Sequence, residues 1–326
     1  MDTFDTVIAA LAPLDEVAII SHFRPDGDAI GSTLALGLAL WAQGKRVHLW
    51  NEDGVPARYA FLEGAELICR PPAEWPAEVQ ALVCVDTGAL NRVGEIGAGL
   101  FAQAPLTLNI DHHETNECYA AVNVVAGGAA ACGCVLYGLL RAWQVSLTPA
   151  MAAALYVAIS TDTGSFQYSS TTPEVMRIAA DLIESGVDVG DINRRIYQEV
   201  PLSTLQVQRE VLNNMVVEEG GAISHYSMPA GRKAELGVSL EDTKDLVDIV
   251  RVLEGVRVAI IFEDLEDGRV RMSLRSKDPR INVASIASQF GGGGHAMAAG
   301  IRMRGSLEEC REKVLQAIRA AVRSES

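Results

Sequence analysis

Basic residues are scarce in this chain of 326 residues. It has 27 lysines and arginines against 42 aspartates and glutamates, which gives a formal net charge of −15. Tight binding of long nucleic acid needs a basic track along the phosphates. The charge therefore argues against that class of function. A polyanionic ligand of this chain should be short and held by a few local groups.

Cysteines and long apolar runs are also limited. The six cysteines show neither C-x-x-C spacing nor the density of a disulfide scaffold, which fits a reducing cytoplasm. The first five residues are acidic where a signal peptide would be basic. The most apolar region, 120–143, is interrupted by Asn123 and four glycines, so it predicts a buried strand and helix rather than a membrane span. We expect a cytoplasmic protein without membrane contacts.

The chain is rich enough in apolar residues to fold. Hydrophobic residues make up 49% and charged residues 21% of it, and its length favours about two domains. The first half alternates between predicted strands and helices, which indicates an α/β domain with a mainly parallel sheet and helices on both faces. The strands are expected at 17–21, 47–50, 81–85 and 106–110, and the helices at 29–43, 129–143, 149–160 and 173–185.

The pattern changes in the second half. A connecting helix is predicted at 189–198 and another up to 214. Two hairpins, two helices, a strand and a final helix then indicate a smaller α+β domain. They are expected at 215–218 with 222–226, 256–263 with 269–275, 240–253 (capped by Ser239), 283–290, 300–303 and from 307. The predicted boundaries are 1–187 for the first domain, 188–214 for a helical linker and 215–326 for the second domain.

Acidic and imidazole side chains follow apolar segments at four places in the first half. In open α/β sheets the carboxyl ends of the strands form the edge where ligands bind. One such aspartate would be ordinary surface, but several together predict a site. The four places are His22, Asp26 and Asp28 after 17–20, Asp86 after 82–85, Asp111, His112 and His113 after 106–110, and Asp162 after 155–159.

These side chains predict a site for two metal ions. The predicted ligands are four carboxylates and two imidazoles, namely Asp26, Asp28, Asp86, Asp162, His22 and His112. The set contains no cysteine, so it suits Mn²⁺, with Mg²⁺ as an alternative, rather than structural zinc. Four negative charges balance two divalent ions. Two ions about 3.5–4 Å apart form the usual clamp for in-line attack at phosphorus.

The segment from His22 to Asp28 is expected to be a loop. Pro25 and Gly27 disfavour a helix there, so we expect the loop to wrap one ion with His22, Asp26 and Asp28 together. Gly31 and Ser32 would then open the next helix, whose N-terminus could help to hold an anion.

The second domain offers a separate group of candidate ligand-binding residues. The run Gly291 to Gly294 before His295 follows a predicted helix rather than a strand, so it is not a dinucleotide-binding fingerprint. A flexible connection is one interpretation of it. The other is a bare backbone that a ligand approaches, with His295 donating to a phosphate or base edge. Arg275 with Ser276, at the end of a hairpin strand, offers a fork-shaped phosphate donor.

Taken together, these motifs resemble those of the DHH phosphoesterases. The matching segments are 22–32, Val85-Asp86, Asp111-His112-His113 and Ser160-Thr161-Asp162. The glycine run with Ala298-Ala299-Gly300 resembles the DHH-associated C-terminal domain. The length is similar to the NrnA-type members, which degrade very short RNA and dephosphorylate 3′-phosphoadenosine 5′-phosphate.

The resemblance implies a role for each candidate residue. The six predicted ligands would bind two Mn²⁺ ions, with Asp86 and Asp162 contacting both. His113 would face the substrate and Asp111 would orient the triplet. The residues that would bind the nucleotide are Arg275, Ser276, Gly293, Gly294 and His295.

The implied function is Mn²⁺-dependent hydrolysis of phosphoester bonds. The expected substrates are short RNA or DNA oligonucleotides and nucleotide bisphosphates, but not long duplexes. Efficiency should fall with length, because each added phosphate would meet nothing basic on a chain of charge −15. The alternatives are a phosphodiesterase for cyclic di-AMP or its linear product, a pyrophosphatase and a non-catalytic nucleotide sensor. A homodimer is an open alternative to a monomer.

Overall fold

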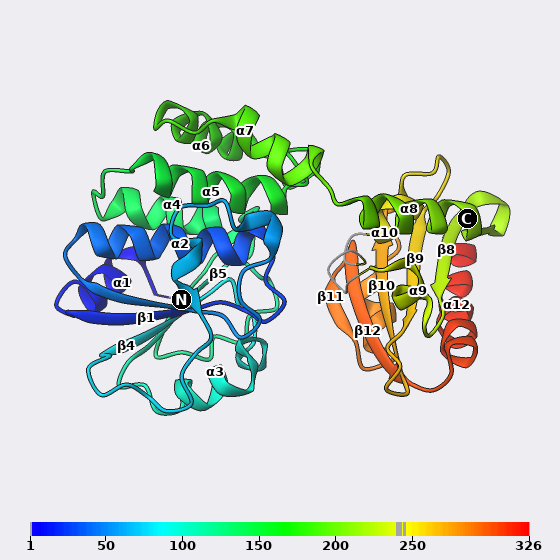
Figure 1. The fold of residues 1–326 in the computed structure, drawn as a ribbon, viewed down its shortest axis with the longest axis horizontal. Coiled ribbons are helices and arrows are strands. Elements are labelled where there is room, and N and C mark those ends of the chain that lie inside the picture. The colour runs from blue at the N-terminus through cyan, green and yellow to red at the C-terminus, as the bar shows by residue number, and fades with distance from the viewer. Residues whose placement is uncertain (1, 239–242, 244–245, 326) are drawn as a thin grey trace. The chain divides into compact units, whose positions relative to one another are not determined.

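A computed structural model describes residues 2–238, 243 and 246–325 of the chain. The chain divides into two compact units, Met1–Glu199 and Val200–Ser326, which are described separately here (Figure 1). The predicted helix at 240–253 falls partly outside the described residues, as does its predicted cap Ser239. Its described part is α10 (Leu246–Arg251).

The first unit is built on a six-stranded sheet in which every pair of neighbouring strands is parallel. Its order is β3-β2-β1-β4-β5-β6. This confirms the predicted α/β fold. The strands are β1 (Glu16–Ile20), β2 (Arg46–Trp50), β3 (Ile68–Cys69), β4 (Ala81–Val85), β5 (Thr107–Asp111) and β6 (Val122–Val125).

Helices cover both faces of this sheet. Val17 and Ile19 of β1 belong to the larger core beneath α2, α4 and α5, whereas Ala18 and Ile20 face the core with α3. This alternation follows from the period of two along a strand. The helices are α1 (Phe4–Leu11), α2 (Gly27–Ala42), α3 (Gly94–Phe101), α4 (Cys132–Ala142), α5 (Pro149–Asp162) and α6 (Pro173–Glu184). Neither α1 nor α3 was predicted.

Helix α5 packs closely against α2 and α4 because glycines lie at the contacts. A Cβ atom on Gly31 would lie 2.3 Å from the backbone oxygen of Ala154, and one on Gly133 would lie 2.7 Å from Cβ of Ala158. The prediction that Gly31 and Ser32 open helix α2 is wrong. The helix already begins at Gly27, and both residues are buried in its second turn.

The predicted linker 188–214 divides between the two units. Helix α7 (Val189–Asn193) and the π-helical turn η4 (Arg194–Gln198) belong to the first unit, and α8 (Leu202–Asn214) belongs to the second. Single turns of 3₁₀-helix occur at η1 (Ala57–Tyr59), η2 (Ala65–Leu67), η3 (Leu90–Val93) and η5 (Glu219–Gly221). Over the described residues, no helix is both long and apolar enough to cross a membrane.

The second unit contains a mixed six-stranded sheet with the order β11-β12-β10-β9-β8-β7. Both predicted hairpins are present, and β8 and β9 are its parallel neighbours. The glycine run is not a flexible connection, because its second part forms edge strand β11. The strands are β7 (Val216–Glu218), β8 (Ile223–Met228), β9 (Val258–Asp264), β10 (Arg269–Ser276), β11 (Gly293–His295) and β12 (Ala298–Arg304).

Two separate cores cover this second sheet. Helices α11 (Val283–Ser288) and α12 (Leu307–Ser324) pack against one face. Helices α8 and α10 pack on β8 and β9 from the other face, where α9 (Arg232–Leu236) also lies. On β10 the buried residues Val270, Met272 and Leu274 point toward α11 and α12. The intervening residues of β10 therefore face the other side.

Candidate metal centre

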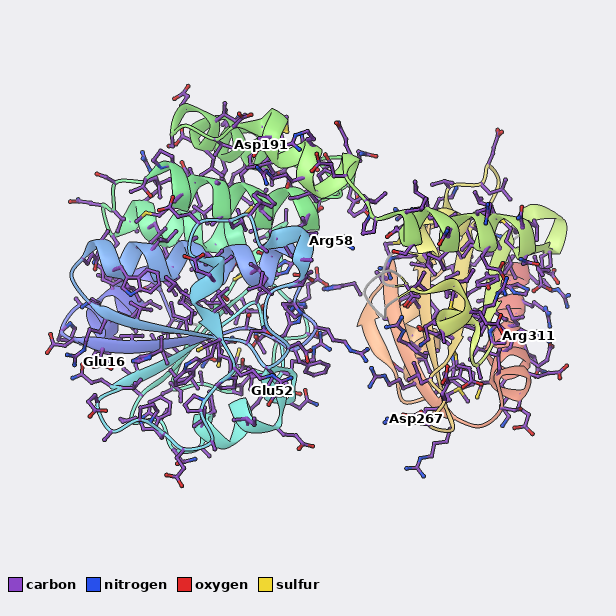
Figure 2. All side chains as sticks on the ribbon, viewed as in Figure 1. Glu16, Glu52, Arg58, Asp191, Asp267 and Arg311 are labelled. Atoms are coloured by element: carbon purple, nitrogen blue, oxygen red, sulfur yellow. The ribbon has the colours of Figure 1, made fainter. Side chains whose placement is uncertain are left out.

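The predicted ligands of the first unit come together at one edge of the parallel sheet. His22 follows β1, Asp86 follows β4 and His112 follows β5, and these three strands are neighbours. Figure 2 labels Glu16, at the amino end of β1, and Glu52, just after the carboxyl end of β2, on opposite sides of this unit. The cluster lies on the carboxyl side, where open α/β sheets bind ligands.

The six predicted ligands form two groups of three. His22, Asp26 and Asp86 make one group, and Asp28, His112 and Asp162 make the other, with ligand atoms within 4.8 Å of one another in each. The expectation that His22, Asp26 and Asp28 wrap one ion is wrong. Asp26 is the N-cap of α2 and Asp28 lies inside its first turn, so the two carboxylates face different groups. Asp162 is the last residue of α5 and does not follow a strand.

Asp86 stands between the two groups. Its Oδ2 lies 3.4 Å from Nε2 of His22, and its Oδ1 lies 3.4 Å from Nε2 of His112. Oδ1 is buried and has no hydrogen-bond partner in the part of the chain that the structure describes. The backbone of Asp86 is left-handed, with φ of 52°, and such strain is common at functional sites. A divalent cation would satisfy the unpaired oxygen.

Both imidazoles are held in the orientation of metal ligands. Nδ1 of His22 donates to the backbone oxygen of Phe23 at 2.8 Å, and Nδ1 of His112 donates to that of Ala129 at 3.2 Å. Each ring therefore presents the lone pair of Nε2 to the carboxylates when it is neutral. A backbone acceptor on the second ring nitrogen is the usual support of a metal-binding histidine.

The Asp28 carboxylate is fixed by Ser32 and by two backbone amides that the sequence analysis did not single out. Its Oδ1 accepts from the Ser32 hydroxyl and from the Gly133 amide, each at 2.9 Å, and its Oδ2 accepts from the Cys132 amide at 2.6 Å. Cys132 and Gly133 open α4. Asp26 divides its oxygens, since Oδ1 caps α2 and Oδ2 lies 3.7 Å from Nε2 of His22.

His113 is held by Asp111, and with Asp86 and His112 it forms a third group whose ligand atoms lie within 4.8 Å of one another. Its Nδ1 donates to Oδ1 of Asp111 at 2.8 Å, although it also lies 3.8 Å from Oδ1 of Asp86. Oδ2 of Asp111 accepts from Asn116 at 2.6 Å, and Asn116 also donates to Asn109 at 2.8 Å. His113 can therefore contact a ligand through Nε2. Asn116, five residues after Asp111, was missed by the sequence analysis.

The cluster holds protons that a cation would displace. Burial lowers the pKa of His22, but Asp26 and Asp86 outweigh it and raise that pKa to about 10. The carboxylates around His112 likewise overcome burial and raise its pKa to about 11. Burial and the charge of Asp86 raise the pKa of Asp28 to about 8. Burial opposes ionisation of Asp86 too, yet the two imidazoles bring its pKa well below the usual range.

In the second unit, strand register brings Arg275 and His295 into one row. Ala298 of β12 pairs with Arg275 of β10 on one side and with His295 of β11 on the other. Directly paired residues of antiparallel strands point to the same face. Neither side chain thus belongs to the core beneath α11 and α12, and both lie on the opposite face of the sheet.

The predicted glycines differ in what their positions require. Gly294 has φ of 141°, and a Cβ atom there would lie 2.4 Å from the backbone oxygen of Ala298, so the fold itself requires glycine. A Cβ atom on Gly293 would meet nothing within 4 Å. Packing of the described residues does not explain Gly293, whose bare backbone is open to a ligand.

Ser276 does not fit the role predicted for it. The residue is buried, and its hydroxyl donates to the backbone oxygen of Asp278 at 2.8 Å and accepts from the Asp278 amide at 3.1 Å. Strand alternation also points it away from Arg275. Ser276 therefore stabilises the turn after β10 and is not available to a substrate.

Comparison with family models divides the chain in the same way as its two units. The N-terminal domain of the DHH family matches residues 16–159, and the DHHA1 domain matches residues 226–324. The bifunctional oligoribonuclease and PAP phosphatase NrnA of Thermus thermophilus is 35% identical over 305 residues, which is 93% of this chain and 89% of the relative. The chain belongs to the DHH family. It is an NrnA-type member and thus a hydrolase of phosphoester bonds.

A second curated relative of this DHH protein has the same name, and a solved structure has the same fold. The bifunctional oligoribonuclease and PAP phosphatase NrnA of Bacillus subtilis is 24% identical over 90% of this chain and 91% of its own length. Among solved structures, an exopolyphosphatase-related protein from Bacteroides fragilis superposes with a TM-score of 0.87 at 25% identity. The match covers 98% of this chain and 95% of that one.

Proposed function

We propose that this protein is a two-metal, Mn²⁺-dependent phosphoesterase that degrades very short oligonucleotides to mononucleotides and removes the 3′-phosphate of 3′-phosphoadenosine 5′-phosphate. The carboxylate of Asp86 carries the proposal, since each of its oxygens faces a different histidine-containing group. The substrates follow from the two relatives, whose names give oligoribonuclease and PAP phosphatase activity. The hard donor set favours Mn²⁺ or Mg²⁺.

In this mechanism the chain positions two ions and a phosphate. His22, Asp26 and Asp86 would hold one ion, and Asp28, His112 and Asp162 would hold the other, with Asp86 shared. Bound divalent ions would supply an activated water and the positive charge that in-line attack at phosphorus needs. Burial lowers the pKa of His113, but Asp111 outweighs it and raises that pKa. The protonated ring, held by Asp111 through Nδ1, would donate from Nε2 to a phosphoryl oxygen and so stabilise its developing charge.

The second unit would bind the nucleotide. Arg275 and His295, which share one row of the sheet, would contact phosphate, and the open backbone at Gly293 would let the ligand approach. We therefore assign the metal chemistry to residues 1–187 and substrate binding to residues 215–326. Ser276 and Gly294 are not part of this assignment, because both have structural roles.

One substrate panel tests this function. Purified protein with Mn²⁺ should hydrolyse the bisphosphonucleotide and a dinucleotide faster than a 20-nucleotide RNA, cyclic di-AMP or pyrophosphate, and chelation should abolish all activity. Arg275→Ala and His295→Ala should each lower kcat/KM about ten- to a hundredfold, which is the usual cost of a lost charge-assisted contact. Both variants should keep the wild-type metal content.

The control for this test is Lys313→Ala, which removes an exposed cation from α12, on the side of the second sheet opposite Arg275 and His295. It should leave the kinetics unchanged. Preference for cyclic di-AMP would move the assignment to a cyclic dinucleotide phosphodiesterase. Wild-type rates in both Arg275→Ala and His295→Ala would show that the second unit does not bind the nucleotide through these two residues.

A further inference from the structure

Two arginines face each other on the side of the second sheet opposite α11 and α12. Arg271 of β10 pairs directly with Arg302 of β12 in the antiparallel register, so both side chains leave the same face. Like charges directly opposite one another destabilise a sheet. Nothing in the core requires this pair, because the neighbouring residues Val270, Met272 and Ile301 supply the packing.

Of these two arginines, only Arg271 has an ion-pair partner among the residues that the structure describes. Arg271 forms an ion pair with the buried carboxylate of Glu263 and donates to the Thr243 hydroxyl at 3.0 Å. Lys233 also binds Glu263, at 2.8 Å. Arg302 is exposed and forms no ion pair with any residue that the structure describes. Two cations thus share the Glu263 carboxylate, and Arg302, which faces Arg271, adds a further positive charge on this side of the sheet.

The pair is aligned with the row that contains Arg275 and His295. Arg271 lies four residues before Arg275 on the same face of β10, so the two Cα atoms are about 13 Å apart along the strand. The positions between the two rows are small. A Cβ atom on Gly300 would approach nothing closer than 3.8 Å and one on Gly293 nothing within 4 Å, so packing does not demand glycine at either.

We propose that Arg302, supported by Arg271, is a second anion site, which binds a phosphate further along the same oligonucleotide than the one held by Arg275 and His295. The bare strip at Gly293 and Gly300 is the path of the nucleotide chain between them. This inference rests on the proposed function and adds a length range to it. The net charge predicted that every added phosphate would meet nothing basic, and this face is the exception.

The test compares substrate lengths in the Mn²⁺-loaded protein. Arg302→Ala should raise KM for a five-nucleotide RNA about three- to fivefold, the upper range for an exposed ionic contact, with little change in kcat. KM for the dinucleotide and the bisphosphonucleotide should stay within error, since neither reaches the second row. Arg302→Lys should recover most of the affinity. The slope of log KM against log salt for the five-nucleotide RNA should flatten by roughly 0.7, one phosphate contact.

Lys313→Ala is the matched control, because it removes one exposed cation from the opposite side of the same sheet. It should leave KM unchanged for both the dinucleotide and the five-nucleotide RNA. Equal effects of Arg302→Ala on the dinucleotide and the five-nucleotide RNA, or equal effects of the two alanine variants, would overturn the second anion site. Such a result leaves the proposed function intact if the wild-type protein hydrolyses short RNA. Failure of the wild-type protein to hydrolyse any short RNA would instead refute the proposed function.

Discussion

The two sheets of this protein assemble functional side chains in different ways. The parallel sheet gathers residues from separate chain segments at one edge, where the loops after β1, β4 and β5 meet the end of α5. The mixed sheet arranges residues across a face, because register places Arg275, Ala298 and His295 side by side. Loop ends converge on a small buried volume, whereas strand register produces an extended, open row.

The electrostatics of the two regions follow from this difference. In the first, carboxylates and imidazoles are buried together, so their pKa values are shifted and they share protons until a cation replaces them. In the second, Arg302 is exposed and keeps its charge without a partner among the described residues. Metal content and substrate affinity should therefore respond to different substitutions.

The largest expected effect comes from Asp86→Asn. Asp86 is a member of one ligand group, and its Oδ1 lies 3.4 Å from Nε2 of His112 in the other, so this variant should lose both ions and lower kcat/KM for every substrate by at least about 10³-fold. Asp26→Asn touches one group and should retain one ion. Elemental analysis after desalting, together with kinetics, measures both. Asp5→Asn, an exposed position on α1, is the control. Two tightly bound ions in the Asp86 variant would show that metal binding in the first region does not depend on Asp86.

Asn116→Ala should separate orientation from metal binding within the first region. Asn116 holds Asp111, which in turn holds His113, and loss of such supporting hydrogen bonds typically costs about ten- to a hundredfold. We expect kcat to fall while KM and metal content stay near wild type. The matched control is Asn91→Ala, an exposed position in η3, which should change neither the kinetics nor the metal content. Loss of metal in the Asn116 variant would show instead that Asn116 holds the metal ligands in position.

Metal affinity should increase with pH. Without metal, the pKa values of His22 and His112 are raised to about 10 and 11, so both rings are protonated at pH 7. Each ring must lose its proton to bind a cation. The apparent affinity should therefore rise about tenfold per pH unit for each proton released between pH 6 and 8. Calorimetry in buffers of different ionisation enthalpy counts these protons, and a constant affinity over that range would contradict the shared-proton picture.

Ser276→Ala should have the smallest kinetic effect, despite its position beside Arg275. Its hydroxyl stabilises the turn at Asp278, so we expect a loss of about 1 kcal/mol in the free energy of unfolding. The kinetics should not change below the melting transition. Thermal denaturation and KM for the dinucleotide measure the two quantities. A raised KM with unchanged stability would show that Ser276 binds the substrate together with Arg275 and His295.

The sequence allowed the candidate ligands to be predicted where an acidic or imidazole side chain follows an apolar segment. His22, Asp86 and His112 each come directly after a buried strand, and parallel strands bring their carboxyl ends to one edge. Such a pattern is local, so it can be recognised without coordinates. It could not show how Asp26 and Asp28 divide between two groups, because that depends on the exact start of α2.

The sequence was less informative where long-range register decides the result. The strand character of Gly293 to His295 depends on pairing with β12, and glycine has a low intrinsic preference for strands. The facing pair Arg271 and Arg302 becomes visible only when β10 and β12 are aligned. Asn116 lies in a loop, and its link to Asp111 has no sequence signal beyond the short spacing.

The central claim is that Asp86 lies between two metal ions. Anomalous diffraction at the manganese edge, from crystals grown with Mn²⁺, tests it most directly. The account predicts two peaks roughly 3.5–4 Å apart, one on each side of the Asp86 carboxylate, with His22 near one and His112 near the other. A single peak, or two peaks that Asp86 does not bridge, would contradict it.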